Sequence, residues 1–279
     1  MTKSPDSDPT PMFDVDAPAP LTPVEQLLAL ADLYTRHNDR IDLLFAGRST
    51  VAPDVFVSSA RGLEREMLAC LKTIRQQRLP AREPVPSAVV RLKQIAHLTS
   101  GATRYLTSAQ QALPAGDGEP GRPDPRRRFG QHLRLARELT ALAPATIVES
   151  ARHIAPRLHN RARTSTTVPG MAKAQRDTLL EVARGHVSLT EQNGQPDYGN
   201  TATVDTDVLH HLETQGWVTR EPGSAPPFFP GGPTRDRLRL TALGLPVLST
   251  VVDAPLVVSL PTARPAPAPA ATTAARTRR

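Results

Sequence analysis

The chain has 279 residues, enough for one large domain or two ordinary ones, and its single cysteine, Cys70, excludes an intramolecular disulfide and a cysteine-rich zinc site. Its 29 prolines and hydrophobic share of 39% predict that part of the chain does not pack into a core. A net charge of +7 favours a nucleic-acid partner, although a GC-rich genome also explains 30 arginines beside 4 lysines.

The N-terminal segment, residues 1–20, carries one basic and four acidic residues among its prolines and shows no hydrophobic periodicity. We expect it to be disordered. It has no apolar run of the kind found in signal peptides, and no stretch of the chain approaches the roughly 20 apolar residues needed to span a bilayer. These observations predict a cytoplasmic protein with no membrane partner.

Residues 21–163 are predicted to form a helical domain. Apolar residues recur at helical spacing in three stretches that begin near Pro23, Pro53 and Ser87. Thr22 fits the N-cap position of the first helix, and the proline-rich segment RLPAREPVP stops the second, because proline cannot continue a helix.

A linker at about residues 114–125 separates these helices from a strongly basic segment. Residues 122–163 contain ten arginines and three acidic residues on two more amphipathic helices, and Pro156 is expected to kink or divide the second. The polar half of the first of these helices favours contact with nucleic-acid phosphates; a solvated face is the alternative. The candidate residues are Arg126, Arg127, Arg134 and Arg137.

Residues 172–252 are predicted to form a separate domain that mixes helices and strands. Its elements are a helix (173–184), a strand (186–191), an Asn193-Gly194 turn, a return strand (about 199–203), a helix (205–215), a strand (217–220), a loop (221–234), a strand (235–240) and a helix (242–250). The last segment, residues 253–279, is basic and rich in alanine and proline, which predicts an extended, disordered tail.

The run LHHLETQGWVTREPG, followed by DRLRLTALG, resembles the C-terminal half of bacterial winged-helix domains. In that family a helix ends at a glycine, here Gly216, and an apolar residue, here Trp217, opens a strand. A loop then forms the wing, here residues 221–234, and the next strand leads into a Leu-Thr-x-x-Gly helix start, here residues 240–244. The family has a helix before its recognition helix, where this chain has the hairpin signal.

The resemblance covers about 80 of the 279 residues. Together with the helical pattern of the first half, it implies a mainly α protein: an N-terminal helical bundle, a C-terminal winged-helix-like α+β domain, and disordered termini. It also implies that the helix at residues 205–215 occupies the position of a DNA-reading helix.

That helix is poorly equipped to read DNA bases. Its outward face offers Thr206 and His210 as candidate nucleic-acid contacts, but Asp207 and Glu213 share the face and carboxylates repel phosphates. If DNA is bound, we therefore expect backbone charge to dominate over base reading.

The wing strand, in TRDRLRLT, alternates Arg235, Arg237 and Arg239 with other residues. On a strand, this spacing sends the three arginines to one side and the leucines to the core, so we expect the arginines to be exposed. Three exposed guanidinium groups would suit a phosphate backbone. The alternative is a solvated face that blocks edge-to-edge pairing of the sheet.

No motif of catalytic or cofactor chemistry is found: GxSxG, HExxH, paired CxxC and the dinucleotide fingerprint are all missing. Asp207 and His210 are three residues apart on a helix and could share a metal ion, but no third ligand is identifiable, because the adjacent His211 points about 100° away from His210. Cys70 adjoins an apolar stripe and is interpreted as a buried structural thiol. We therefore predict no enzymatic activity, no cofactor and no metal site.

Two functions remain open. The first is a DNA-associated regulatory or accessory protein that holds double-stranded DNA mainly through backbone charge. The second is a protein-interaction adaptor, in which the winged-helix unit does not read DNA and the helical half binds a protein partner or a second copy.

Overall fold

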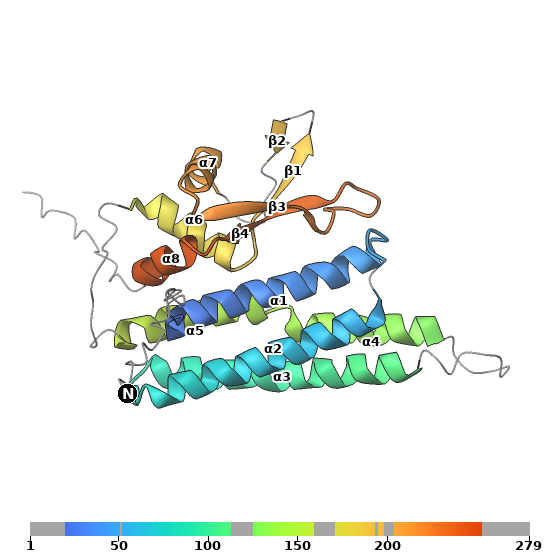
Figure 1. Ribbon diagram of the computed structural model, residues 1–279, viewed down its shortest axis with the longest axis horizontal. Helices are drawn as coiled ribbons and strands as arrows, with labels where there is room; N and C mark the ends of the chain where they lie inside the picture. Colours follow the sequence, from blue (N-terminus) through green and yellow to red (C-terminus); the bar gives the residue numbers. More distant parts are fainter. Residues whose placement is uncertain are drawn as a thin grey trace, which may run out of the picture.

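The computed structural model describes residues 20–50, 52–112, 125–158, 171–192, 195–197 and 204–252. The described protein is mainly helical, with a small antiparallel sheet near its C-terminal end (Figure 1). Its elements are α1 (Pro23–Phe45), α2 (Pro53–Gln76), α3 (Val85–Ala112), α4 (Pro125–Thr140), α5 (Ala143–Leu158), α6 (Lys173–Ala183), β1 (Ser188–Gln192), β2 (Gln195–Asp197), α7 (Thr206–Thr214), β3 (Val218–Ala225), β4 (Arg235–Leu240) and α8 (Gly244–Val252).

The helices of the first half begin and end close to where the sequence predicts. Thr22 caps α1 as expected: its hydroxyl accepts a hydrogen bond from the Glu25 backbone N–H at 3.3 Å, and the Glu25 carboxylate accepts one from the Thr22 N–H at 2.7 Å. α2 ends at Gln76, before the proline-rich segment. Pro156 does not divide α5, which continues to Leu158. The predicted tails and most of the 114–125 linker lie outside the described residues.

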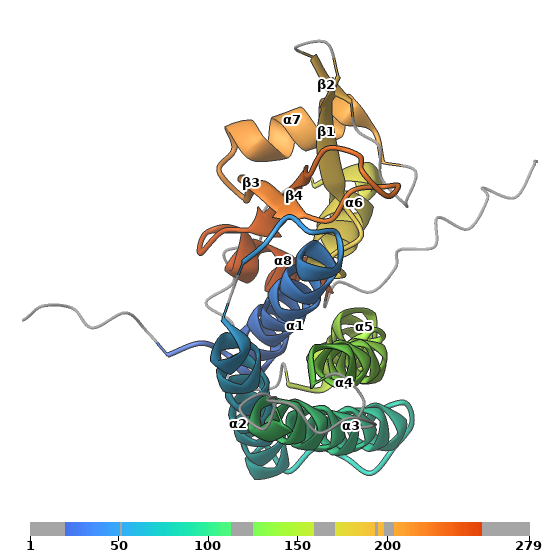
Figure 2. The same ribbon diagram turned by 90° about the vertical axis from the view of Figure 1, so that its right-hand side faces the viewer.

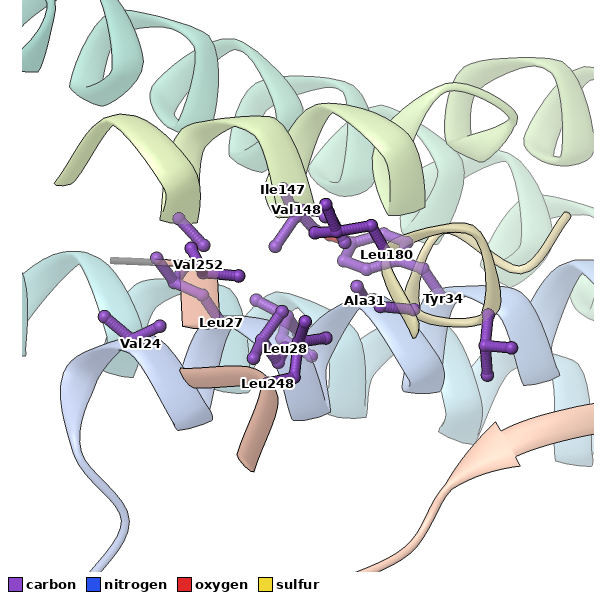
Figure 3. Packing of buried hydrophobic residues seen from close by; sticks show 14 of the residues in the cluster. Val24, Leu27, Leu28, Ala31, Tyr34, Ile147, Val148, Leu180, Leu248 and Val252 are labelled. Carbon is purple, nitrogen blue, oxygen red and sulfur yellow. The ribbon is translucent and has the colours of Figure 1, made fainter. Parts of the chain in front are cut away.

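α1 is the central helix of the molecule. Its sequence predicts a single apolar stripe, yet it is buried on several sides, because α2 and α5 pack on it from below and the C-terminal unit packs on it from above (Figures 1 and 2). Figure 3 shows side chains of α1 in contact range of those from α5, α6 and α8; the labelled residues are Val24, Leu27, Leu28, Ala31, Tyr34, Ile147, Val148, Leu180, Leu248 and Val252.

Two apolar clusters hold these elements together. The larger contains residues of α1, α2, α3 and α5 together with residues of α6, α7, α8 and the sheet, so it extends across both predicted domains. The smaller lies under the C-terminal half of α1 and includes Ile41, Phe56, Leu106 and Leu133. The division into domains of 21–163 and 172–252 remains a prediction, but their apolar interiors are continuous.

The sheet has the strand order β2-β1-β4-β3, with antiparallel neighbours. β2 begins at Gln195, earlier than the predicted 199, because Gln192 pairs directly with Gln195 and only two residues remain for the turn. The turn residues 193–194 lie outside the described part. β3 continues to Ala225, beyond the predicted end at residue 220. No helix among the described residues is long and apolar enough to cross a membrane.

Candidate nucleic-acid interface

The three wing arginines share one side of β4, as the period of a strand predicts, but that side does not face solvent. Arg235, Arg237 and Arg239 are only 8%, 7% and 3% exposed. The expectation of an exposed arginine edge is therefore wrong. The reason is α1, which lies against this face of the sheet (Figure 2). Its Asp39 and Asp32 bring carboxylates to the arginines.

Arg237 makes the most buried of these contacts. Its Nη2 donates to Asp39 Oδ1 at 2.5 Å and its Nε to Asp39 Oδ2 at 2.9 Å, in the two-pronged geometry that suits a guanidinium and a carboxylate. Its Nη1 also donates to the backbone oxygen of Gly185 at 2.7 Å. Because both charged groups are almost fully buried, the pair joins α1 to β4 and to the turn between α6 and β1.

Arg239 belongs to a wider ionic network on the same face. Its Nη1 donates to Asp32 Oδ1 at 2.7 Å, and its Nε donates to Glu221 of β3. Arg36 of α1 completes the network, since it pairs with Asp32 at 2.8 Å and with Glu221 at 3.3 Å. Arg239 also lies 3.6 Å from Asp39 Oδ2, so the network of α1, β3 and β4 is continuous with the Arg237–Asp39 pair.

Arg235 is held without a carboxylate. Its Nη1 donates to Ser188 Oγ at 2.7 Å and its Nε to the Pro226 backbone oxygen at 2.7 Å. Its guanidinium also lies 3.7 Å from the centre of the Phe228 ring. Burial, and then the charge of Arg237, lower the pKa of Arg235 from its ordinary value. The three wing arginines therefore contribute to internal packing, and none is presented to an external phosphate.

The α4 arginines have a different environment. Arg126, Arg127 and Arg134 are exposed, and Arg134 lies 5.3 Å from the centre of the Phe45 ring at the end of α1. Arg137 is turned inward, with its Nε donating to both oxygens of Asp42 at 2.9 Å. Exposed Arg128, which the sequence reading did not single out, adds to the basic face.

α7 presents the polar face that its sequence predicts. Leu209 and Leu212 are buried, whereas Thr206, Asp207 and His210 are exposed. α7 lies on the outer side of the C-terminal unit, and α4 lies in the bundle on the other side of α1 (Figures 1 and 2). The structure therefore does not bring the α7 candidates together with the α4 arginines.

The loop between β3 and β4 is tied back to the rest of the protein. Arg48, just after α1, donates from Nη2 to the backbone oxygens of Gly231 and Gly232 at 3.2 and 3.0 Å. Phe228 and Phe229 remain 52% and 62% exposed at the surface of this loop. The hydrogen bonds from Arg48 to the loop thus hold these two aromatic side chains at the surface.

One basic surface, on α2, was not predicted from the sequence. Arg61, Arg65, Lys72 and Arg75 are all exposed on α2. Residues 21–113 contain twelve basic and eight acidic residues, so their net charge does not reveal these four cations. Several of the acidic side chains in that range are turned toward internal partners and do not balance the cations at the surface. A helical wheel of α2 would have found them, since they lie within about 80° of arc on one face.

The remaining sequence interpretations concern chemistry. Cys70 is buried, and burial raises the pKa of its thiol to about 11, as expected for a structural cysteine. Among the described residues, no group of three or more potential ligands could hold a metal ion.

Comparisons with protein-family models, with curated proteins and with solved structures give no match for this chain.

Proposed function

We propose that this protein is a DNA-associated accessory or regulatory protein that contacts the phosphate backbone through the exposed arginines of α4. The observation that supports this proposal is the concentration of charge on one short helix. Arg126, Arg127, Arg128 and Arg134 are exposed within about 12 Å of helix length, and Glu138 is the acidic residue nearest to them on α4.

The position of these arginines in the helix strengthens the argument. Three of them follow Pro125 in the first turn of α4, which carries no acidic residue. The N-terminal end of a helix has a partial positive charge, so adjacent arginines raise the electrostatic energy of the free protein. A bound phosphate would relieve this repulsion and would also meet the first backbone N–H groups of the helix.

We also propose that the C-terminal unit is a variant of the winged-helix arrangement, with α7 in the place of the recognition helix and β3 and β4 as the wing. Two features support this assignment: the helix α7 followed by the hairpin β3-β4, and the adjacency of β1, β4 and β3 in the sheet. The full chain order is α6-β1-β2-α7-β3-β4-α8, so the strand β2 stands where the family has a helix. In this protein we propose that the unit mainly stabilises α1, because the wing arginines contact α1 and exposed Asp207 opposes phosphate contact by α7.

The test is a titration of the full chain with duplex DNA at several salt concentrations. We expect weak dependence on DNA sequence and a steep loss of affinity with salt. Changing Arg126, Arg127, Arg128 and Arg134 together to Ala should flatten the plot of log K against log salt by up to about 3.6 units, at roughly 0.9 per phosphate contact. The matched quadruple change to Lys keeps the charge and should leave the slope nearly unchanged.

A protein-interaction adaptor is the second candidate. It is favoured by two separate features, the exposed Phe228 and Phe229 in the wing loop and the exposed Asp207 on α7, which suit a protein partner better than a nucleic acid. If the full chain shows no binding to duplex DNA at near-physiological salt, the DNA proposal fails and the adaptor is preferred.

A further inference from the structure

The exposed face of α2 carries a basic stripe, defined here as Arg61, Arg65, Lys72 and Arg75. These residues follow one another at spacings of four, seven and three, so they share one side of the helix over about 21 Å. Leu68 lies in the middle of the stripe and is 55% exposed. The core face of α2, with Met67 and Ile74, lies opposite.

The basic stripe has two features of a docking surface. First, none of its four cations forms an ion pair or hydrogen bond with another of the described residues, whereas Glu64 at its edge is engaged by Ser100. Secondly, a surface hollow of about 290 Å³ opens on the last turns of α2; its lining is Leu68, Leu71, Lys72, Arg75 and Gln76. An occupant should therefore be acidic and should carry an apolar side chain.

We propose that the basic stripe binds the N-terminal segment of the same chain, residues 1–19, with Phe13 in the hollow. The sequence MTKSPDSDPTPMFDVDAP has the required chemistry, because Asp14 and Asp16 follow the apolar pair Met12-Phe13. With Asp6 and Asp8, the segment offers four carboxylates to the four cations of the stripe.

The position of the segment also fits. α1 and α2 form an antiparallel hairpin of 23 and 24 residues, so the first turn of α1 lies beside the last turns of α2 (Figure 1). Seven residue-to-residue steps join Phe13 to Pro20 and span up to about 25 Å. The hollow begins at the end of α2 and extends about 12 Å along it, so Phe13 can reach it by passing around one helix.

This path sets a register. Asp14 and Asp16 lie between Phe13 and α1, which places them near Lys72 and Arg75. Asp6 and Asp8 lie beyond Phe13, toward Arg65 and Arg61. The segment then covers cations that would otherwise attract nucleic acid, and it leaves the α4 arginines uncovered. The contact does not depend on DNA binding, so it stands or fails separately from the proposed function.

The experiment places a benzophenone side chain at position 13 of the full chain and irradiates an equal mixture of isotope-labelled and unlabelled protein. We expect cross-linked peptides to contain residues 65–76 and to join segments with the same label. The same group at position 229, in the exposed wing loop, is the control and should not mark α2. Cross-links that join differently labelled chains would assign the stripe to a second copy, and scattered or absent cross-links would exclude docking; each result overturns the proposal.

Charge exchange provides the second readout. The double change K72E/R75E on the exposed face should lower the cross-linking yield by roughly fivefold, because exposed ion pairs contribute modestly. Adding D14K/D16K to that variant should restore the yield to within about twofold, which a merely misfolded α2 would not allow. Failure of this rescue, with an unchanged melting temperature in both variants, would also overturn the proposal.

Discussion

Both β4 and α4 carry several arginines close together in the chain, yet the fold uses the two sets in opposite ways. The β4 set is buried against α1, where Asp39 and Asp32 meet Arg237 and Arg239. Most of the α4 set remains at the surface, and only Arg137 turns inward, to Asp42. The difference arises from the partner: each buried arginine faces a polar group brought by a distant segment.

This comparison shows why local charge is a weak guide to an interface. Residues 172–252 are acidic overall, yet Arg237 and Arg239 pair with Asp39 and Asp32 of α1, about 200 residues earlier in the chain. Residues 122–163 are strongly basic, and Arg127, Arg128 and Arg134 of α4 are exposed. An interface is therefore better sought among the charges that the fold leaves exposed than in a count along the sequence.

The largest expected effect comes from breaking the buried pair. Changing Asp39 to Ala leaves the Arg237 guanidinium buried without its carboxylate, and removing one partner of such a pair costs about 3–5 kcal/mol of unfolding free energy. Chemical denaturation of the full chain, followed by circular dichroism, measures this loss. The control is Arg127→Ala on exposed α4, which should change stability by no more than about 0.5 kcal/mol. Equal effects of the two variants would contradict the comparison.

The sequence predicts much of the fold but little of this contrast. Helix and strand positions followed from apolar periodicity, the Thr22 cap and the proline breaks, all of which are local signals. The common side of the three β4 arginines also followed from strand period. The sequence does not predict that α1 covers this side. Asp32 and Asp39 have the pattern of solvent-facing polar residues on α1, and only the position of the sheet shows that they are buried. The basic stripe of α2 was not predicted, because a net charge summed over a segment does not show which residues share one face of a helix.

A pH dependence tests the bundle side of α1. His37 is buried, and burial, followed by the charges of Arg40 and Arg137, lowers its pKa from 6.5 to about 4. The unfolded chain therefore takes up a proton at higher pH than the folded one. Stability should fall as pH decreases from about 6.5 to about 4, by up to about 1.4 kcal/mol per pH unit.

Thermal unfolding between pH 7 and pH 4 reveals this slope. His37→Leu should remove it, because the unfolded chain then has no proton to gain at this position. His97→Gln, a change at an exposed histidine, serves as the control and should leave the slope in place. A slope unchanged in the His37 variant would show that other groups cause the pH dependence.

The close approach of α1 to the turn before β1 gives a smaller effect. Gly185 has φ +72°, and a Cβ there would lie 2.5 Å from Thr35 Oγ1 of α1. Gly185→Ala combines left-handed backbone strain with this clash, so we expect a loss of about 2 kcal/mol or more. Gly47→Ala is matched, since Gly47 has φ +66° and no neighbour within 4 Å; it should lose about 1 kcal/mol, the strain alone.

The relief of this clash can be measured directly. Adding Thr35→Ala to Gly185→Ala removes the opposing hydroxyl and methyl groups, and the double variant should be more stable than additivity of the two single changes predicts. Strict additivity would mean that α1 does not press on this turn in solution.

The smallest expected effect concerns the wing loop, where an arginine outside both sets makes contact through neutral carbonyls. Arg48→Ala removes the two hydrogen bonds to the backbone oxygens of Gly231 and Gly232. Arg48 is exposed, and those oxygens can bond to water instead, so the free energy of unfolding should fall by only about 0.5–1.5 kcal/mol. The loop itself should respond more: its backbone amides should exchange with solvent faster, while those of β4 keep their protection. Hydrogen exchange measured by mass spectrometry separates the two segments. Faster exchange throughout β4 as well would show that Arg48 helps to hold the sheet against α1, and the contrast between buried and exposed arginines would then need a third, intermediate class.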